Sequence, residues 1–250
     1  MSDTQLRPCL SGLPAELILE IALTSCASSQ RCYANILSVC RLFYNLCRLP
    51  CLSVIPVVLE TPHQTKLFAE FLQTNPAAAL RIRRLWIIKD FHDIIPQCIN
   101  LNALACDGHD LLPITSGELF QHNCLCDLTI MGLWDFWSPF VKSRHGRSLC
   151  GQLQRLWLLD HLFLRGVEVE WWSSLRELYY WSIERRGACD QFRDEVVLLG
   201  ALSTLRRFGV IMHSPSPTVF RQLMQVKDPR LQVVSWGKRR ELVEWMNMRI

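Results

Sequence analysis

The chain has 250 residues, enough for one large domain or for a small domain beside a medium-sized one. Half of the residues are hydrophobic and a fifth are charged, which excludes intrinsic disorder for most of the chain. The formal net charge of +4 arises in residues 151–250, where acidic side chains dilute the basic ones. Nucleic-acid-binding proteins usually carry a concentrated basic stripe, so we expect no nucleic-acid partner.

The apolar stretches are too short to cross a membrane, because a helical span needs about 20 apolar residues. The residues after Met1 lack the basic-then-apolar pattern of a secretory signal. We therefore expect no membrane partner, a cytoplasmic and/or nuclear location and reduced cysteines. His122, Cys124 and Cys126 have a spacing that could suit zinc, but buried apolar cysteines are the preferred interpretation. No metal or other cofactor is predicted.

Residues 1–10 are predicted to be a flexible terminus, and residues 11–50 a small helical domain. The first helix should begin near Pro14, which suits a first turn because it has no N–H to leave unpaired. Glu16 and Glu20 mark the polar stripe of this helix, and its other residues are mostly apolar. Such a helix must be covered on more than one side.

A second helix is predicted over residues 31–47, separated from the first by a polar loop at 24–30. It is also apolar over a wide face, and so short a domain has little chain to cover both helices. We expect a partner to supply part of the cover.

Two short motifs in this segment resemble those of the F-box. Residues 13–17 read Leu-Pro-Ala-Glu-Leu, Ile21 follows four positions later, and residues 39–43 read Val-Cys-Arg-Leu-Phe. Two departures are Phe43 in place of the commoner Trp and a somewhat longer stretch between the motifs. The resemblance implies a trihelical module that binds the Skp adaptor of a cullin–RING ubiquitin ligase. The residues that would contact the adaptor are Leu13, Pro14, Glu16, Leu17, Ile21, Val39, Cys40, Arg41 and Phe43.

Residues 51–250 contain a recurring Leu-x-x-Leu-x-Leu-type pattern. Its first positions lie about 25 residues apart on average, within the roughly 20–29 of leucine-rich repeats. The seven first positions are Ile82, Leu101, Leu125, Leu153, Leu175, Leu205 and Leu231. Positions one, four and six of each repeat, which carry the leucine-type residues, should point into the core.

Further elements complete this part of the chain. An apolar strand at 54–59 would start the array, and a helix at 61–73 would follow it, capped by its first residue. Helices are also predicted at 191–202 and 217–226, and a capping helix at 238–248. We therefore predict an α/β fold: a small N-terminal helical F-box followed by an irregular leucine-rich-repeat-like αβ solenoid with a C-terminal capping helix.

Positions three and five of each repeat should face the opposite, concave surface. Neighbouring strands would align them into two ladders, one rich in charged side chains and one rich in aromatic side chains. Arg, Trp and Tyr are enriched at binding hot spots, so these ladders are the predicted substrate surface. Its residues are Arg84, Trp86, Arg155, Trp157, Glu177, Tyr179 and Arg207.

The sequence shows none of the common catalytic motifs, such as Gly-x-Ser-x-Gly or His-Glu-x-x-His, so an enzyme is not predicted. The F-box followed by degenerate repeats resembles fungal F-box-domain-containing proteins. That resemblance implies a substrate-recognition subunit of an SCF-type ligase, which docks the Skp adaptor, and through it a cullin, and holds an unknown protein substrate. The alternative is a leucine-rich-repeat interaction scaffold with a vestigial F-box and no role in ubiquitination.

Overall fold

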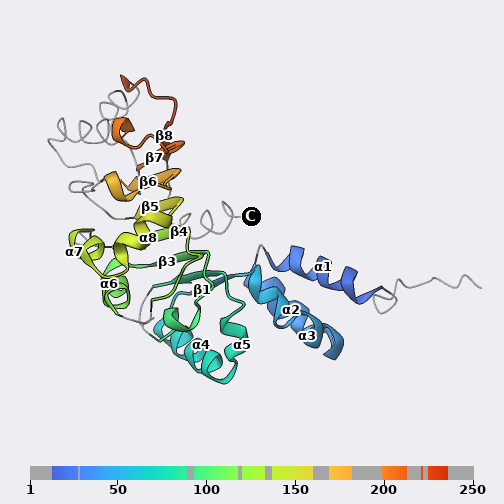
Figure 1. The fold of residues 1–250 in the computed structure, drawn as a ribbon. Coiled ribbons are helices and arrows are strands. Elements are labelled where there is room, and N and C mark those ends of the chain that lie inside the picture. Colours follow the sequence, from blue (N-terminus) through green and yellow to red (C-terminus); the bar gives the residue numbers. More distant parts are fainter. Residues whose placement is uncertain are drawn as a thin grey trace, which may run out of the picture.

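The structure is a computed structural model of the chain (Figure 1). The residues that it describes are 13–27, 29–88, 93–117, 120–132, 137–159, 169–181, 199–212, 221 and 225–235. Within these ranges, no helix is both long and apolar enough to span a bilayer.

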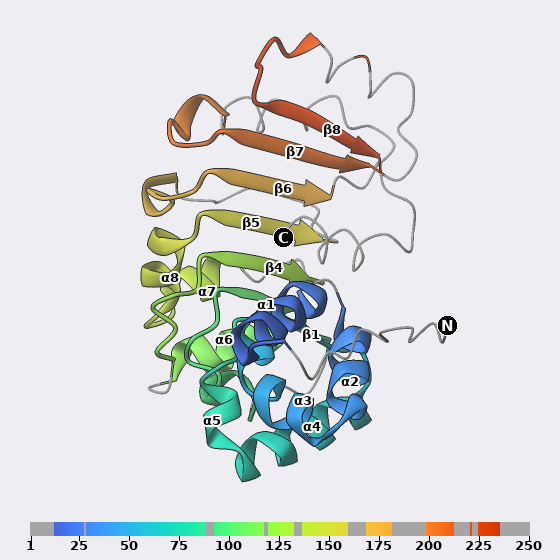
Figure 2. The ribbon, with the colours of Figure 1, turned by 90° about the vertical axis from the view of Figure 1, so that its right-hand side faces the viewer.

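Parallel strands stacked in chain order form the main body of the protein (Figure 2). In the described residues they make one eight-stranded sheet in which each strand pairs with the next along the chain. The strands are β1 (Pro56–Leu59), β2 (Arg84–Ile87), β3 (Ala103–Asp107), β4 (Asp127–Met131), β5 (Arg155–Leu159), β6 (Glu177–Trp181), β7 (Arg207–Met212) and β8 (Leu231–Ser235). Helices among the strands and a parallel sheet confirm the predicted α/β class.

Helical segments connect several of the strands, because parallel neighbours need a crossover. These segments are α4 (Pro62–Thr74) and α5 (Pro76–Ala79) before β2, η3 (Ile95–Gln97) before β3, α6 (Gly108–Ser116) before β4, α7 (Trp137–Lys142) and α8 (Gly146–Gln152) before β5, and η4 (Val169–Trp171) before β6. A further 3-10 helix, η2 (Pro50–Ser53), precedes β1. The connection from β2 to β3 therefore contains a short 3-10 turn in its described part and not an α-helix.

The predicted helix at 61–73 is present as α4, and a capping box explains where it begins. The Thr61 hydroxyl accepts a hydrogen bond from the Gln64 backbone N–H at 3.2 Å, and the Gln64 side chain accepts one from the Thr61 N–H at 3.1 Å. The other predicted segments, 1–10, 191–202, 217–226 and 238–248, lie wholly or largely outside the described residues.

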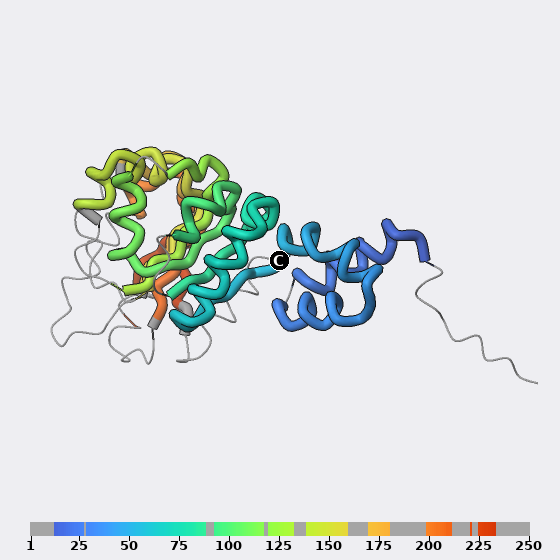
Figure 3. The backbone as a smooth tube through the Cα atoms, turned by 90° about the horizontal axis from the view of Figure 1, so that it is seen from below, coloured from blue at the N-terminus to red at the C-terminus, as the bar shows by residue number. Residues whose placement is uncertain are grey.

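The N-terminal segment forms α1 (Ala15–Cys26), α2 (Gln30–Val39) and α3 (Arg41–Cys47). Figure 3 shows these helices as a separate group beside the first turns of the rest of the chain. The prediction of one helix over 31–47 is wrong, because Cys40 is extended, with φ −166° and ψ 171°, and divides it in two. The loop predicted at 24–30 is also too long, because α1 continues to Cys26.

One contiguous core extends from the N-terminal helices through the sheet. Ala22 and Cys47 share it with Ile55 and the inward side chains of the strands. Positions one, four and six of the first six predicted repeats all belong to this core, which confirms their orientation. They are Ile82, Leu85, Ile87, Leu101, Leu104, Cys106, Leu125, Leu128, Ile130, Leu153, Leu156, Leu158, Leu175, Leu178, Tyr180, Leu205, Phe208 and Val210.

The register predicted for the seventh repeat is wrong by three residues. Leu231 stands opposite Phe208 in β7, where the repeat pattern had placed it opposite Leu205. Arg230 explains the difference, because its guanidinium donates to the backbone carbonyls of Leu199 at 2.7 Å and Leu202 at 3.2 Å. These contacts anchor the chain just before β8 and so determine which residues of β8 pair.

Candidate functional site

Helix α1 has apolar side chains on two faces, and only one face is covered. Ile18, Ala22 and Cys26 follow one another at four-residue spacing and are at most 3% exposed. Leu17 and Ile21 have the same spacing but are 46% and 55% exposed. The helix therefore uses one apolar row for the core of the protein and leaves a second row in solvent.

The junction of α2 and α3 adds further exposed apolar groups. Val39, which ends α2, is 60% exposed, and Leu42 in the first turn of α3 is 49% exposed. Together with three residues in and just before α1 they form what we call the exposed apolar set, which consists of Leu13, Leu17, Ile21, Val39 and Leu42. Among the described residues, this set accounts for five of the eight large hydrophobic side chains that are exposed. Such a concentration of apolar surface is typical of a protein-binding site.

Most of the residues that match the F-box motifs lie on this surface. Pro14, Glu16, Cys40 and Arg41 are exposed along with the apolar residues. Phe43 differs, because its side chain is half-buried and packs against the core, so it contributes to the packing of α3. Leu42 was not predicted, because it occupies the motif position where any residue is allowed.

The aromatic ladder on the sheet aligns as predicted. Trp86 pairs with Ala105, Trp157 pairs with Tyr179, and Tyr179 pairs with Gly209. The Trp157 and Tyr179 rings stack with centroids 3.9 Å apart and an interplanar angle of 9°. The ladder thus forms a continuous strip on the sheet face opposite the main core.

The prediction that these rings are exposed on a concave surface is wrong. Trp86 and Trp157 are 4% exposed and Tyr179 is 5% exposed, within a second apolar cluster that includes Ala105 and Ile211. The Trp157 and Tyr179 rings cover each other, because adjacent strands are only about 4.8 Å apart. Gly209 leaves room for the Tyr179 ring, since a Cβ at this position would lie 2.0 Å from Tyr179 Cδ1.

The charged ladder also aligns as predicted, but its charges pair with one another. Arg155 Nη1 lies 3.0 Å from Asp127 Oδ2, and Arg155 Nε lies 2.9 Å from Glu177 Oε2. Arg207 Nη1 follows at 3.6 Å from Glu177 Oε1 and remains 57% exposed. Arg155 on the predicted substrate surface is therefore already paired, because two neighbouring strands supply carboxylates for it.

Partial burial and charge pairing act against each other on the arginines of this ladder. Burial would lower the pKa of Arg155, but Asp127 and Glu177 outweigh it and raise the pKa above its ordinary value. For Arg84 the effect of burial is the larger one. Burial lowers the pKa of Arg84, and Asp127 offsets this only in part. Both arginines keep their charge, because a guanidinium is not deprotonated in proteins.

The side chains considered for zinc lie in different environments. His122 is buried, with Nε2 donating to the Ile95 carbonyl at 2.9 Å, whereas Cys124 is exposed. The Cys126 thiol donates to the Asn102 carbonyl with an S···O distance of 3.6 Å. In the part of the chain that the structure describes, no three His, Cys, Asp or Glu side chains are grouped so as to hold a metal ion.

Comparison with known proteins does not assign the chain to a family. No protein-family model matches the chain, and a search of the curated proteins finds no match. The described fold is of the α/β class, and its most distinctive surface is the exposed apolar set on the N-terminal helices.

Proposed function

We propose that this protein is a substrate-recognition subunit of an SCF-type cullin–RING ubiquitin ligase. The observation that carries the proposal is the coincidence of two independent features on the same residues. Leu13, Leu17, Ile21 and Val39 match the F-box motifs in the sequence, and they are also exposed apolar side chains in the folded protein. A domain that docks an adaptor requires this combination, because the adaptor supplies the missing apolar cover.

The proposed architecture is an F-box followed by an irregular leucine-rich-repeat-like solenoid. Support for the solenoid comes from the strands, which pair in parallel and in chain order and bury the predicted repeat positions. The N-terminal helices lie near β1, and β8 is at the far end of the stack (Figure 1). An adaptor at one end and a substrate along the stack would bring the substrate close to the ligase, and ubiquitin transfer would take place elsewhere in the assembly.

The substrate surface of this proposal is narrower than the sequence predicted. Arg207 at 57% side-chain exposure is the most accessible of the described charges in the paired ladder. We propose that a substrate contacts the β6–β7 end of the ladder, through Arg207 and the partly exposed Glu177. The stacked rings beside it would hold these strands in place without touching the substrate.

The test of adaptor docking is the double substitution Leu17→Glu/Ile21→Glu in the full chain. Burial of each side chain is worth about 1.5–3 kcal/mol, so loss of both should weaken adaptor binding by about 100-fold or more. The measurement is co-purification of a Skp-type adaptor with its cullin. Both residues are exposed, so the thermal unfolding temperature should be nearly unchanged.

The matched control is Leu67→Glu/Leu80→Glu, because these leucines are 52% and 47% exposed but lie outside the N-terminal helices. We expect the control to retain the adaptor. Equal recovery of adaptor with both variants would show that the exposed apolar set is not the docking surface. Failure of the wild-type chain to bind any adaptor would favour the scaffold with a vestigial F-box.

A further inference from the structure

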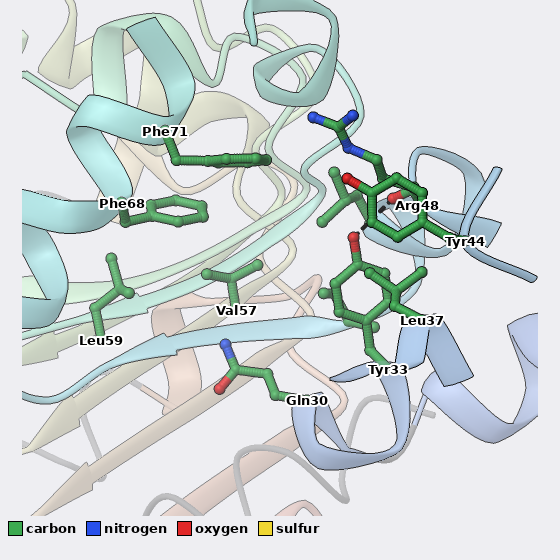
Figure 4. A pocket seen from close by; sticks show the side chains of 11 residues that line it. Gln30, Tyr33, Leu37, Tyr44, Arg48, Val57, Leu59, Phe68 and Phe71 are labelled. Carbon is green, nitrogen blue, oxygen red and sulfur yellow. Dashed lines mark hydrogen bonds between the residues drawn. The ribbon is translucent and has the colours of Figure 1, made fainter. Parts of the chain in front are cut away.

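A cavity of about 460 Å³ lies where α2 and α3 meet β1 and α4 (Figure 4). Most of its wall is apolar and is contributed by four separate segments of the chain. The apolar wall residues are Leu37, Leu52, Ile55, Val57, Leu59, Phe68 and Phe71. The Phe68 and Phe71 rings stack along the α4 side, with centroids 6.0 Å apart. The volume lies within the range of about 300–1,000 Å³ typical of small-molecule sites.

The polar groups of the cavity come from the N-terminal helices. They belong to Gln30, Tyr33, Tyr44 and Arg48. The Tyr33 hydroxyl donates to the Arg48 backbone carbonyl at 2.8 Å. Burial, the leading cause, raises the pKa of Tyr33 to about 12, so the phenol stays neutral at physiological pH.

Arg48 is the charged residue of this lining, and none of the described lining residues is acidic. Its guanidinium carbon lies 5.5 Å from the centroid of the Tyr44 ring, and its Nη2 donates to Asn75 Oδ1. These two contacts hold the guanidinium in place beside the Tyr44 ring, which also lines the cavity. A guanidinium has five N–H donors, so donors remain for a ligand after the bond to Asn75.

We infer that this cavity binds a small amphipathic carboxylate, with its alkyl chain against the apolar wall and its carboxylate on Arg48. Charge complementarity selects this class, because a cation without an acidic neighbour in the lining favours an anion, and a carboxylate matches the guanidinium fork. The apolar wall favours an alkyl chain over a fully polar anion such as inorganic phosphate, because the phosphate oxygens that do not reach Arg48 would face apolar side chains.

The site is distinct from the proposed adaptor surface, because no residue of the exposed apolar set lines it. A ligand here would contact both the N-terminal helices and the first strand and helix of the sheet region. It should therefore stabilise the junction between them, since a ligand that binds only the folded state raises the stability.

The test uses decanoate as the probe and decan-1-ol as the matched neutral probe, each titrated into the full chain by calorimetry below its micelle or solubility limit. We expect saturable binding of decanoate with an affinity at least about tenfold above that of decan-1-ol. A rise in thermal unfolding temperature with decanoate should accompany it. Equal affinities for the two probes, or no saturable binding of decanoate, would overturn the inference.

The variant Arg48→Gln should reduce the decanoate affinity by about tenfold or more and leave that of decan-1-ol unchanged. Arg147→Gln is the matched control, because Arg147 also stacks on an aromatic ring, at 4.9 Å from the Trp171 centroid, but lies outside the cavity. If Arg48→Gln fails to fold, the variant Leu37→Trp serves instead. Its larger side chain fills the cavity, so it should weaken the binding of both decanoate and decan-1-ol. An equal loss of decanoate affinity in the Arg48 and Arg147 variants would contradict the assignment of this cavity as the carboxylate site. Unchanged decanoate binding in the Leu37 variant would contradict it as well.

Discussion

The N-terminal helices and the strand stack are similarly rich in apolar residues but use them differently. Helix α1 buries one apolar row and leaves Leu17 and Ile21 in solvent, whereas β5 buries Leu156 on one face and Trp157 on the other. In a stack of parallel strands, each side chain has neighbours above and below, so both faces can be covered from within the chain. A small group of helices has no such neighbours for all its faces. The apolar surplus of the helices therefore stays in solvent, as the proposed adaptor docking requires, whereas that of the strands is buried by packing within the chain.

The largest expected effect comes from placing the same charge in both regions. Leu156→Asp puts an unpaired carboxylate at a site that is 2% exposed, and should cost about 4 kcal/mol or more, enough to unfold the strand stack. Leu17→Asp makes the same change at a site that is 46% exposed, and should alter stability by less than about 0.5 kcal/mol. Urea unfolding followed by circular dichroism measures both. Similar losses in the two variants would break the comparison.

A smaller effect is expected where the aromatic ladder meets Gly209. In Gly209→Ala, the new Cβ would lie 2.0 Å from Tyr179 Cδ1, and the ring cannot move toward β5 because Trp157 stacks there. Overpacking of this kind should cost about 1–3 kcal/mol. Adding Tyr179→Ala should remove the conflict, so the double variant should be more stable than the sum of the two single changes predicts. Additive losses in urea unfolding would mean that the ring does not fill this space.

The smallest expected effect is the pH dependence of stability that arises from His122, a buried side chain of the strand stack. Burial lowers the pKa of His122 in the folded protein, and the bond to the Ile95 carbonyl opposes this only in part. Below about pH 6.5 the unfolded chain therefore binds this proton more readily than the folded one, and stability falls as the pH decreases. His122→Gln should flatten this dependence between about pH 7 and pH 5. Unchanged pH profiles of the unfolding temperature would show that His122 does not contribute.

Local periodicity in the sequence was sufficient to predict which side chains of the first six repeats face the core. Side chains alternate with a period of two, so a Leu-x-x-Leu-x-Leu segment determines which side chains face the core once it is a strand. The two ladders follow from this alternation, and the structure aligns Arg155 with Glu177 as predicted. The start of α4 was equally local, because its capping box involves only Thr61 and Gln64.

Features that depend on distant segments were decided only by the tertiary structure. Burial of Trp157 depends on neighbours from other strands, and the register of β8 depends on Arg230 reaching carbonyls about thirty residues away. The cavity beside Arg48 likewise has walls from α2, α3, α4 and β1, which no sequence window contains. The sequence thus determined the parity of the strands, the start of α4 and the excess of apolar surface, because these arise from neighbouring residues. Exposure, charge pairing and cavities required the fold, because they arise from residues that meet only after the chain has packed.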